Sequence, residues 1–370
     1  MNEVYHIPAM LQETINGLNI QPEGTYVDVT FGGGGHSRAI MSRLGDNGRL
    51  FSFDQDMDAY INEQTPSHSP FKGGECRCSE YPSSKEGLGE VRQLFNDKRW
   101  QFVHGNFRYL KNFMDYYGVT EIDGLLADLG VSFHHFDEAE RGFSFRFAGP
   151  LDMRMNQEGG RTAADIVNTY SEEDLTRVFR IYGEMNNAKA VAQRIVRQRE
   201  NAPILRTEQL TAMLTLPQAP SKRGMSALSA TNGGNSLKIS PSGEVEVPTW
   251  AKKDLARMFQ ALRIEVNDEL GALREMLLAA RELLRPGGRI VILTYHSLED
   301  RIVKNFLRSG NLDGTIEKDF YGNILTPFRV IEKGATASAE EVERNPRARS
   351  AKLRVAEQQC AMHNAQCAMK

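Results

Sequence analysis

Short apolar runs and amphipathic stretches alternate along the first 130 residues. One short apolar run ends at Asp28, and a continuous run of this kind is typical of a strand buried in a parallel sheet. Similar runs predict further strands at residues 49–53, 101–104 and 122–127. Between the first two strands, residues 37–44 have the apolar spacing of a helix, and Gly45 is placed to end that helix in the left-handed conformation.

From residue 138 onward the pattern becomes helical and polar. Helices are predicted at residues 161–169, 171–183, 185–200 and 207–214, and Ser171 and Thr207 are suitable N-caps for two of them. An apolar face that runs from Leu255 to Leu277 predicts one long amphipathic helix ending near Leu284. After it, strands are predicted at residues 289–295, 328–332 and 352–357, with a helix up to Leu307 following the first of them.

This order of elements predicts an α/β fold, a doubly wound and mostly parallel sheet with an inserted all-helical domain. The sheet domain is expected at residues 1–148 and 249–370, and the helical insertion at residues 149–248, ending in a flexible linker. Residues 64–89 and 217–248 are rich in Ser, Pro and Gly. They predict a surface insertion and a linker loop.

Composition limits the classes of partner. The net charge is -3 and the pI is near 6.3, so contact with nucleic acid would need local basic patches. The first residues lack the pattern of a signal peptide and no apolar run has the length of a membrane span, which predicts a cytoplasmic protein without membrane contact. Cys76 and Cys78 have no second pair at zinc spacing, so no metal site is predicted. The oligomeric state stays open.

Four consecutive glycines, Gly32 to Gly35, follow the first strand and precede a helix. Glycines there let the backbone turn tightly and approach a ligand, and Asp54, at the end of the second strand, is placed to bind ribose hydroxyls. An ordinary tight turn is the simpler alternative. Ser37 at the third glycine position disfavours a nicotinamide dehydrogenase, and a P-loop is excluded because no Gly-Lys-Ser/Thr follows. Adenosine without a demanding phosphate remains, and S-adenosyl-L-methionine is the common ligand of that kind.

Ligands of open α/β sheets lie beyond the carboxyl ends of the strands. Five predicted strand ends carry small, polar or aromatic residues, at positions 33–36, 54, 106–107, 128–132 and 296–300. Each has a structural alternative, such as a helix cap at Asp54 or a core side chain at Phe107. Together they predict a cofactor cleft in which Asp128 and His296 border the reacting centre, with Asp128 nearer the cofactor. The Asn/Asp-Pro-Pro-aromatic motif of many amino-methyltransferases is absent, because Asp128-Leu-Gly-Val stands there.

Long strings of this chain resemble the bacterial 16S ribosomal RNA (cytosine-N4) methyltransferase H family, also called MraW. They are Gly34-Gly-His-Ser37, Asp123-Gly-Leu-Leu-Ala-Asp-Leu-Gly-Val-Ser132, Arg141-Gly-Phe-Ser-Phe145, Pro150-Leu-Asp-Met-Arg-Met155, Tyr182-Gly-Glu184, Phe259-Gln-Ala-Leu-Arg-Ile-Glu-Val-Asn267, His296-Ser-Leu-Glu-Asp-Arg-Ile-Val-Lys304 and Asn345-Pro-Arg-Ala-Arg-Ser-Ala-Lys-Leu-Arg354, together with His6-Ile-Pro near the start. The chain departs from the family at residues 132–137, at Thr294-Tyr295, and at residues 64–89 and 217–248, which have no assigned counterpart.

The resemblance implies a class I methyltransferase sheet with a helical insertion. It also implies N4-methylation of a cytidine in the decoding region of 16S rRNA, in the naked RNA, an assembly intermediate or the small ribosomal subunit, with S-adenosyl-L-methionine as donor. By motif position the family's cofactor residues fall on Gly34, Gly35, His36, Asp54, Phe107, Asp128 and His135. A catalytically idle RNA-binding assembly factor on the same fold is the alternative.

The predicted insertion is the expected RNA-recognition domain. It leaves the sheet between the fourth and fifth strands, where an acceptor base would enter, and it carries clustered basic residues. Arg194 and Arg197 lie three residues apart and therefore share a helix face. A basic helix face is often only solvated, but phosphate contacts are what would orient a large RNA at this position.

Overall fold

The computed structural model describes residues 8–56, 97–131, 136, 138–215, 237–322 and 324–360. The chain divides into two compact units: a sheet unit, Met1–Gly130 with Leu270–Lys370, and a helical unit, Val131–Glu269. The helical unit thus has wider bounds than the expected residues 149–248. The predicted insertion at residues 64–89, the greater part of the linker at 217–248, and Cys76 and Cys78 lie outside the described residues. No helix within the described ranges is long and apolar enough to cross a membrane.

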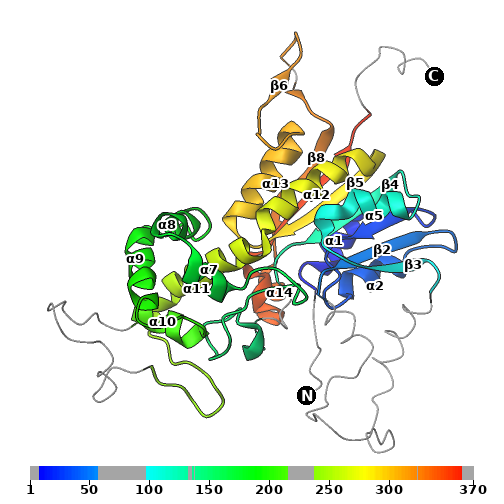
Figure 1. Ribbon diagram of the computed structural model, residues 1–370. Helices are drawn as coiled ribbons and strands as arrows, with labels where there is room; N and C mark the ends of the chain where they lie inside the picture. Colours follow the sequence, from blue (N-terminus) through cyan, green and yellow to red (C-terminus); the bar gives the residue numbers. More distant parts are fainter. Residues whose placement is uncertain are drawn as a thin grey trace, which may run out of the picture. The chain divides into compact units, whose positions relative to one another are not determined.

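The described strands of the sheet unit form a seven-stranded sheet in the order β3-β2-β1-β4-β5-β9-β8 (Figure 1). β1 to β5 pair in parallel, while β9 is antiparallel to both β5 and β8. The strands are β1 (Thr25–Asp28), β2 (Arg49–Asp54), β3 (Trp100–His104), β4 (Ile122–Asp128), β5 (Leu284–Thr294), β8 (Phe328–Thr336) and β9 (Lys352–Gln358). A small hairpin of β6 (Glu317–Lys318) and β7 (Ile324–Leu325) precedes β8.

Both faces of the sheet are covered by helices, because alternate residues of each strand point to opposite sides. On β4, Leu125 joins the cluster of buried side chains contributed by α5, α12 and α13, whereas Leu126 joins the cluster contributed by α1 and α2. In Figure 1, α5, α12 and α13 lie over the same face of the sheet. The prediction of a doubly wound, mostly parallel sheet is confirmed. The covering elements are α1 (Leu11–Leu18), α2 (Gly35–Met41), α5 (Leu110–Tyr116), α12 (Glu269–Leu283), α13 (Ser297–Ser309), α14 (Ala339–Arg344), η1 (Phe107–Tyr109) and η4 (Pro346–Ser350).

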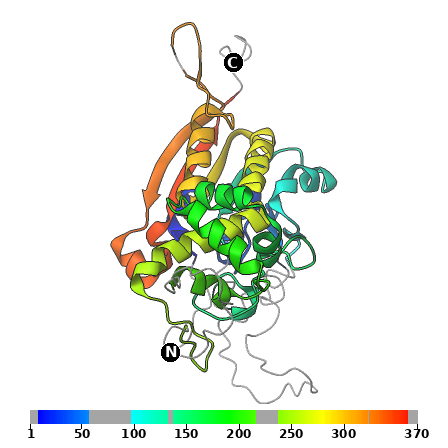
Figure 2. The same cartoon turned by 60° about the vertical axis from the view of Figure 1, so that its left-hand side comes forward.

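The helical unit has a hydrophobic core of its own. Its elements are η2 (Ala139–Arg141), α7 (Ala163–Thr169), α8 (Glu172–Ile181), α9 (Ala188–Arg199), α10 (Thr207–Thr215) and α11 (Thr249–Asn267). Figure 2 shows these helices, green to yellow, gathered around one another. α11 belongs here because Leu255, Met258 and Leu262 are buried with side chains of α7 to α10. Thr162 and Asp165 form a reciprocal capping box at the start of α7.

Two local predictions were wrong. The single helix expected from residue 255 to 284 is two helices, α11 and α12, separated by Asp268 in the left-handed conformation (φ 45°). The apolar spacing continues through the break, so periodicity alone could not reveal it. Gly45 does not have a positive φ, and α2 ends earlier, at Met41. Glycine fits at position 45 because an added Cβ would lie 2.6 Å from Glu23 Oε1.

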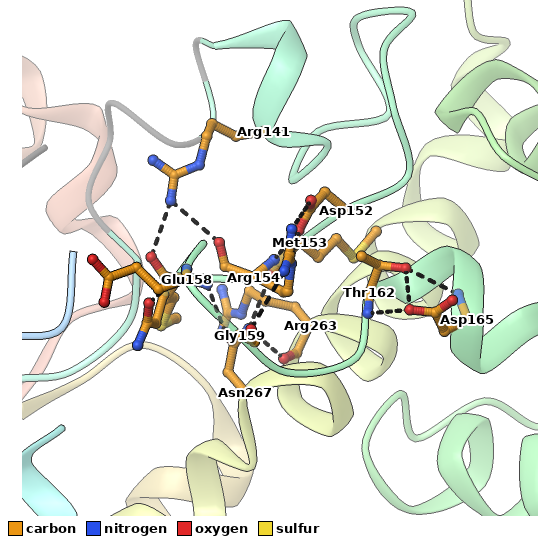
Figure 3. Close-up of polar contacts among 12 residues, drawn as sticks. Arg141, Asp152, Met153, Arg154, Glu158, Gly159, Thr162, Asp165, Arg263 and Asn267 are labelled. Atoms are coloured by element: carbon orange, nitrogen blue, oxygen red, sulfur yellow. Dashed lines mark hydrogen bonds and ion pairs between the residues drawn. The ribbon is translucent and has the colours of Figure 1, made fainter. Parts of the chain in front are cut away.

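A polar network braces the loop that leads into α7 (Figure 3). Met153 has a positive φ of 65°, which is unfavourable for a residue with a long side chain. Asn267 Nδ2 donates to the Met153 carbonyl at 2.8 Å, and Asn267 Oδ1 accepts from Met155 N at 2.8 Å. Arg141 is 5% exposed, and its Nη2 donates to the carbonyls of Arg154 and Met155. The end of α11 therefore holds the 153–155 backbone in place.

We expect Asn267→Ala to lower the free energy of unfolding by about 2–3 kcal/mol, because it removes two partners from partly buried backbone groups. Urea denaturation followed by circular dichroism measures the change. Asn201→Ala is the control, since among the described residues that exposed side chain has its side-chain hydrogen bond with the Arg197 carbonyl of its own helix end, and the change should cost less than about 0.5 kcal/mol. Equal losses in the two variants would contradict the role of Asn267.

Candidate cofactor site

The carboxyl ends of the parallel strands meet at one edge of the sheet unit. β1 lies between β2 and β4, and the strand order reverses direction at the β1–β4 pair. Ligands of doubly wound sheets bind in the crevice at such a reversal. The loops after β1, β2, β3, β4 and β5 all leave from this edge, so a ligand of the sheet is expected there.

The glycine loop connects β1 to α2 through two residues with positive φ, Gly32 at 50° and Gly34 at 66°. Only glycine adopts this conformation freely. Gly34 N donates to the Phe31 carbonyl at 2.7 Å, which closes the turn. Gly35 opens α2, and a Cβ there would lie 2.3 Å from Pro8 Cγ. The glycines are therefore required by the turn and by close packing, and an ordinary turn would also explain them.

Asp54 ties the glycine loop to the end of β2. Its Oδ2 accepts from Gly32 N at 2.9 Å and its Oδ1 accepts from Asp56 N at 2.9 Å. The side chain is only partly buried, and its ionised carboxylate is purely a hydrogen-bond acceptor. Beside it, Asn106 Nδ2 donates to Gln55 Oε1 at 2.8 Å, so the ends of β2 and β3 are also linked.

Phe107 begins η1 directly after the β3 loop. Its ring is partly buried and packs against the cluster that contains Phe53 and Met114. Asn106 caps the element by accepting from Arg108 N at 3.0 Å. The ring therefore has the core role that the sequence left open, and its exposed part remains at the strand-end edge of the sheet.

Two carboxylates and an imidazole are buried together behind the glycine loop. Asp28 is fully buried and accepts from Ser37 Oγ at 2.6 Å and Thr30 N at 3.1 Å. The side chain of Asp128 is 16% exposed, and its Oδ2 lies 3.6 Å from His36 Nδ1. His36 is 5% exposed, and within the described ranges its Nε2 has no hydrogen-bond partner of normal geometry. Such a cluster is costly in a folded core and is found where a ligand supplies the compensation.

Burial dominates the protonation behaviour of this cluster, because it disfavours charged forms. It raises the pKa of Asp128 to about 7, whereas a hydrogen bond from Tyr295 lowers this pKa and the nearby Glu299 charge raises it further. Burial also raises the pKa of Asp28 and lowers the pKa of His36. At neutral pH the imidazole is therefore neutral, and Asp128 is poised between its two forms.

His296 caps α13 at the end of β5. Its Nδ1 accepts from Glu299 N at 3.4 Å, which assigns the ring proton to Nε2. Nε2 lies 3.0 Å from Glu299 Oε1 but lacks the alignment of a hydrogen bond. The side chain is 11% exposed. This capping role accounts for the position of the ring.

The structure brings most of the predicted site residues to one edge of the sheet unit. Gly34, Gly35, His36, Asp54, Phe107, Asp128 and His296 all lie at strand ends there, whereas His135 lies outside the described residues. Sequence reasoning missed Tyr295, whose Oη donates to Asp128 Oδ1 at 2.7 Å, and also Asp28 as a member of the buried cluster. The only signal was position, since Tyr295 directly precedes His296 at a predicted strand end.

Arg194 and Arg197 lie on α9 of the helical unit. Arg194 is partly buried, and its Nη1 donates to the Met213 carbonyl of α10 at 3.1 Å. Arg197 is exposed to solvent. The two arginines thus differ, because one joins two helices while the other projects from the surface.

The donor set suits S-adenosyl-L-methionine. The Asp54 carboxylate is an acceptor of the kind that binds ribose hydroxyls. Among the described residues other than its chain neighbours, the nearest atom to an added Cβ at Gly32 would be the Thr30 carbonyl oxygen, at 4.0 Å. Asp128 offers a carboxylate to a cation, and the described imidazole beside it, His36, is neutral and does not compensate a negative charge. A sulfonium is such a cation, and phosphates would be repelled by the same carboxylates.

The raised pKa of Asp128 predicts a pH-dependent stability. Its unfolded pKa is about 3.9, so the folded cofactor-free protein binds more protons between pH 4 and pH 7 and loses stability as the pH rises through that window. We therefore expect Asp128→Asn to stabilise the cofactor-free protein, with a gain that grows by about 2 kcal/mol from pH 5 to pH 8. Denaturant titrations at the two pH values measure it.

Asp300→Asn is the matched control of opposite sign. Burial of Asp300 is outweighed by Arg354, whose Nε lies 2.8 Å from Oδ1, and the pKa of Asp300 is lowered. Its contribution to stability is present above the unfolded pKa and is lost as the pH falls, so this variant should be destabilised at pH 8. A stability gain of Asp128→Asn that is the same at both pH values would show that the carboxylate does not titrate as described.

Comparison with known proteins identifies relatives along almost the whole chain. A ribosomal RNA small subunit methyltransferase H of Bacteroides thetaiotaomicron is 48% identical over 358 residues, which is 95% of this chain and 97% of the relative. Those of Parabacteroides distasonis and Porphyromonas gingivalis are each 49% identical, over 95% and 96% of this chain and 97% of each relative. A solved putative rRNA methylase from Clostridium thermocellum is 14% identical with a TM-score of 0.38, over 95% of this chain and 99% of its own. That superposition is too loose to indicate a substrate.

The sequence profile of the MraW methylase family matches residues 3–73 and 84–359. Residues 217–248 and most of 64–89 lie within these matched ranges, so the expectation that both segments are additions without a counterpart holds at most for residues 74–83. The resemblance carried by the strand-end motifs is confirmed over nearly the full length. The chain belongs to the MraW methylase family.

Proposed function

We propose that this protein methylates the exocyclic N4 of a cytidine in the decoding region of 16S rRNA, with S-adenosyl-L-methionine as donor, in the cytoplasm. The observation that carries the proposal is the identity of about 48% to proteins named ribosomal RNA small subunit methyltransferase H, over about 95% of the chain. The strand-end donor set of the sheet unit supports the cofactor.

The residues of the sheet unit have distinct roles in this proposal. Gly34 and Gly35 let the backbone approach the cofactor, and Asp54 accepts from the ribose hydroxyls while it holds the Gly32 amide. Phe107 offers a partly exposed ring beside the adenosine, and Asp128 and His36 face the amino-acid part. When bound, S-adenosyl-L-methionine supplies an electrophilic methyl group on a sulfonium. The family's sequence pattern also gives His135 a place in this set.

The acceptor amine requires positioning more than activation. Methyl transfer is an in-line displacement, so the enzyme gains most from alignment and from a matched charge distribution. Asp128 and His296, at the ends of the adjacent strands β4 and β5, are the residues that we assign to the border of the reacting centre. A general base is not required, since the proton can leave to water after transfer.

We propose that the helical unit recognises RNA. Phosphate contacts need exposed cations on a net acidic protein, and Arg197 is such a cation. Arg194 has a structural contact with the Met213 carbonyl, so its share in RNA binding is the smaller of the two. This refines the expectation in which both arginines had equal parts.

The direct test is transfer of tritiated methyl from S-adenosyl-L-methionine to 16S rRNA or small subunits that lack the modification, with N4-methylcytidine identified in the digest. We expect Asp54→Ala to weaken cofactor binding by about 2 kcal/mol in calorimetry, because it removes hydrogen bonds to a charged acceptor. Transfer by this variant should recover at a high cofactor concentration.

Asp115→Ala is the control for Asp54, because that exposed carboxylate pairs only with Lys111 of the same helix in the described structure. It should bind the cofactor as the unaltered protein does. Cofactor binding without methyl transfer to any of these RNAs would favour the idle assembly factor. Unchanged affinity in a folded Asp54→Ala protein would remove Asp54 from the site.

The RNA role of the helical unit predicts that Arg197→Glu weakens RNA binding and flattens its dependence on salt, because one phosphate contact contributes about one unit to the salt slope. Affinity for the cofactor should be unchanged. Arg194→Glu together with Arg197→Glu should weaken binding further, but only the single variant leaves the contact between α9 and α10 intact. Filter binding over a series of salt concentrations measures both slopes.

Lys318→Glu, on the β6–β7 hairpin, changes the net charge by the same amount and serves as the control. A general charge effect would make the two single variants equal. If Arg197→Glu leaves the salt slope unaltered, the arginine is solvated surface and the RNA contacts lie elsewhere.

A further inference from the structure

Tyr295 joins the ends of β4 and β5 by a side-chain hydrogen bond. Asp128 is paired in register with Leu293, so Tyr295 lies just beyond it on the neighbouring parallel strand. Tyr295 Oη donates to Asp128 Oδ1 at 2.7 Å, a short distance for a hydroxyl and a carboxylate. The backbone N of Tyr295 donates to Glu299 Oε2 at 3.1 Å, which fixes the residue from the other side.

The charged groups around Asp128 make this bond important. Asp28 on β1 and Glu299 on α13 are carboxylates, and both oppose a further negative charge. His36 on α2 faces Oδ2 at 3.6 Å, but its burial disfavours the imidazolium. Glu341 on α14 acts on Tyr295 itself, whose pKa is raised well above its ordinary value by burial and by Asp128, so the hydroxyl keeps its proton. Tyr295 is thus a stable neutral donor to Asp128.

We propose that Tyr295 is a positioning residue that holds the Asp128 carboxylate in its ionised form, so that the site prefers the cationic methyl donor to the neutral thioether product. This rests on the proposed function, in which Asp128 faces the cofactor. S-Adenosyl-L-methionine and S-adenosyl-L-homocysteine share their adenosine and amino-acid groups and differ by the methyl group and the sulfonium charge. Only the ionised carboxylate can distinguish them by charge.

Proton binding at Asp128 is linked to the hydrogen bond that Tyr295 donates to it. A hydrogen bond donated to the carboxylate stabilises the ionised form and has little to offer the protonated form. Without the hydroxyl, burial and the neighbouring carboxylates act unopposed, and Asp128 takes up a proton at a higher pH. The ionised Asp128 carboxylate also helps product release, because its attraction to the sulfonium ends when the sulfonium becomes a thioether.

The first experiment needs no cofactor. Tyr295→Phe keeps the aromatic ring, and the titration of Asp128 is followed by NMR of the protein labelled with ¹³C at the aspartate carboxyl carbon, with Asp128→Asn assigning the signal. We expect the midpoint of the Asp128 titration to move upward by about one to two pH units. An unmoved midpoint would overturn the proposal, whatever the protein does as an enzyme.

Tyr170→Phe is the matched control. Tyr170 Oη also donates to a carboxylate at 2.7 Å, that of Glu265, but this pair lies within the helical unit. The variant loses an equivalent hydrogen bond and should leave the Asp128 signal where it was. A shift of the same size in both variants would show a general loss of structure and would also overturn the proposal.

The second experiment measures the ratio of affinities for S-adenosyl-L-methionine and S-adenosyl-L-homocysteine by calorimetry between pH 6.5 and pH 9. The sulfonium lowers the pKa of the amino group in only one of the two ligands, so the ratio is compared between Tyr295→Phe and the unaltered protein at each pH, which cancels the titration of the ligands. We expect Tyr295→Phe to lower it by about tenfold at pH 7.5 and to recover it toward pH 9, where Asp128 ionises without help. In an Asp128→Asn background, Tyr295→Phe should change the ratio no further.

The outcomes separate the two hypotheses. A moved titration with an unmoved affinity ratio would overturn the link between Tyr295 and cofactor choice while methyl transfer to RNA still stands. A ratio that falls at every pH without recovery would mean that Tyr295 shapes the site by packing, and it would contradict control through charge. Failure to bind either ligand in the unaltered protein would refute the proposed function itself, with the titration result intact.

Discussion

The site depends on one constraint, which is that the Asp128 carboxylate is held in a largely buried position where β1 and β4 separate. β1 and β4 pair in parallel with Asp28 opposite Leu126, so Asp128 extends two residues beyond it at the same edge. The Asp128 backbone N donates to Thr30 Oγ1 at 2.7 Å, which keeps the strand end close to the glycine loop. Two carboxylates near one neutral imidazole cannot both ionise cheaply. A bound cation would lower the energetic cost of ionising both carboxylates. In the cofactor-free protein, protonation of a carboxylate lowers that cost instead.

The sheet keeps the two carboxylates close together because helices pack tightly on both of its faces. Leu125 and Leu126 of β4 are buried completely on opposite faces, each in a cluster that includes helices from distant parts of the chain. Such packing leaves the strand ends little freedom to move the carboxylates apart. The pKa of Asp128 is therefore set by the fold, and among the described residues the Tyr295 hydroxyl, just past the end of β5, lowers it by a side-chain hydrogen bond.

The sequence predicted the sheet and its acidic strand ends because short apolar runs, which indicate buried strands, are followed directly by Asp28, Asp54 and Asp128. It could not predict which of these side chains would share a cluster, since that depends on strand order, and it did not single out Tyr295, because a tyrosine after an apolar run looks like core. The break at Asp268 was missed for a related reason. Apolar spacing stays in phase across a left-handed residue, so the pattern does not show that the chain passes from one compact unit to the other.

Arg141 in the helical unit and His36 in the sheet unit differ in how completely their buried polar atoms are hydrogen-bonded. In the helical unit Arg141 is buried with its Nη2 donating to two carbonyls, and the Gln157 amide oxygen, in the orientation its surroundings require, accepts from Nε and Nη1 at 3.1 and 3.0 Å. In the described part of the sheet unit, His36 Nε2 is buried without a partner of normal hydrogen-bond geometry, beside Asp128 with its raised pKa. A satisfied network fixes a loop, whereas an incomplete one leaves interactions for a ligand to complete. The incomplete network lies at the strand ends behind the glycine loop, so the same physical test that makes Arg141 structural supports the sheet unit as the location of the proposed chemistry.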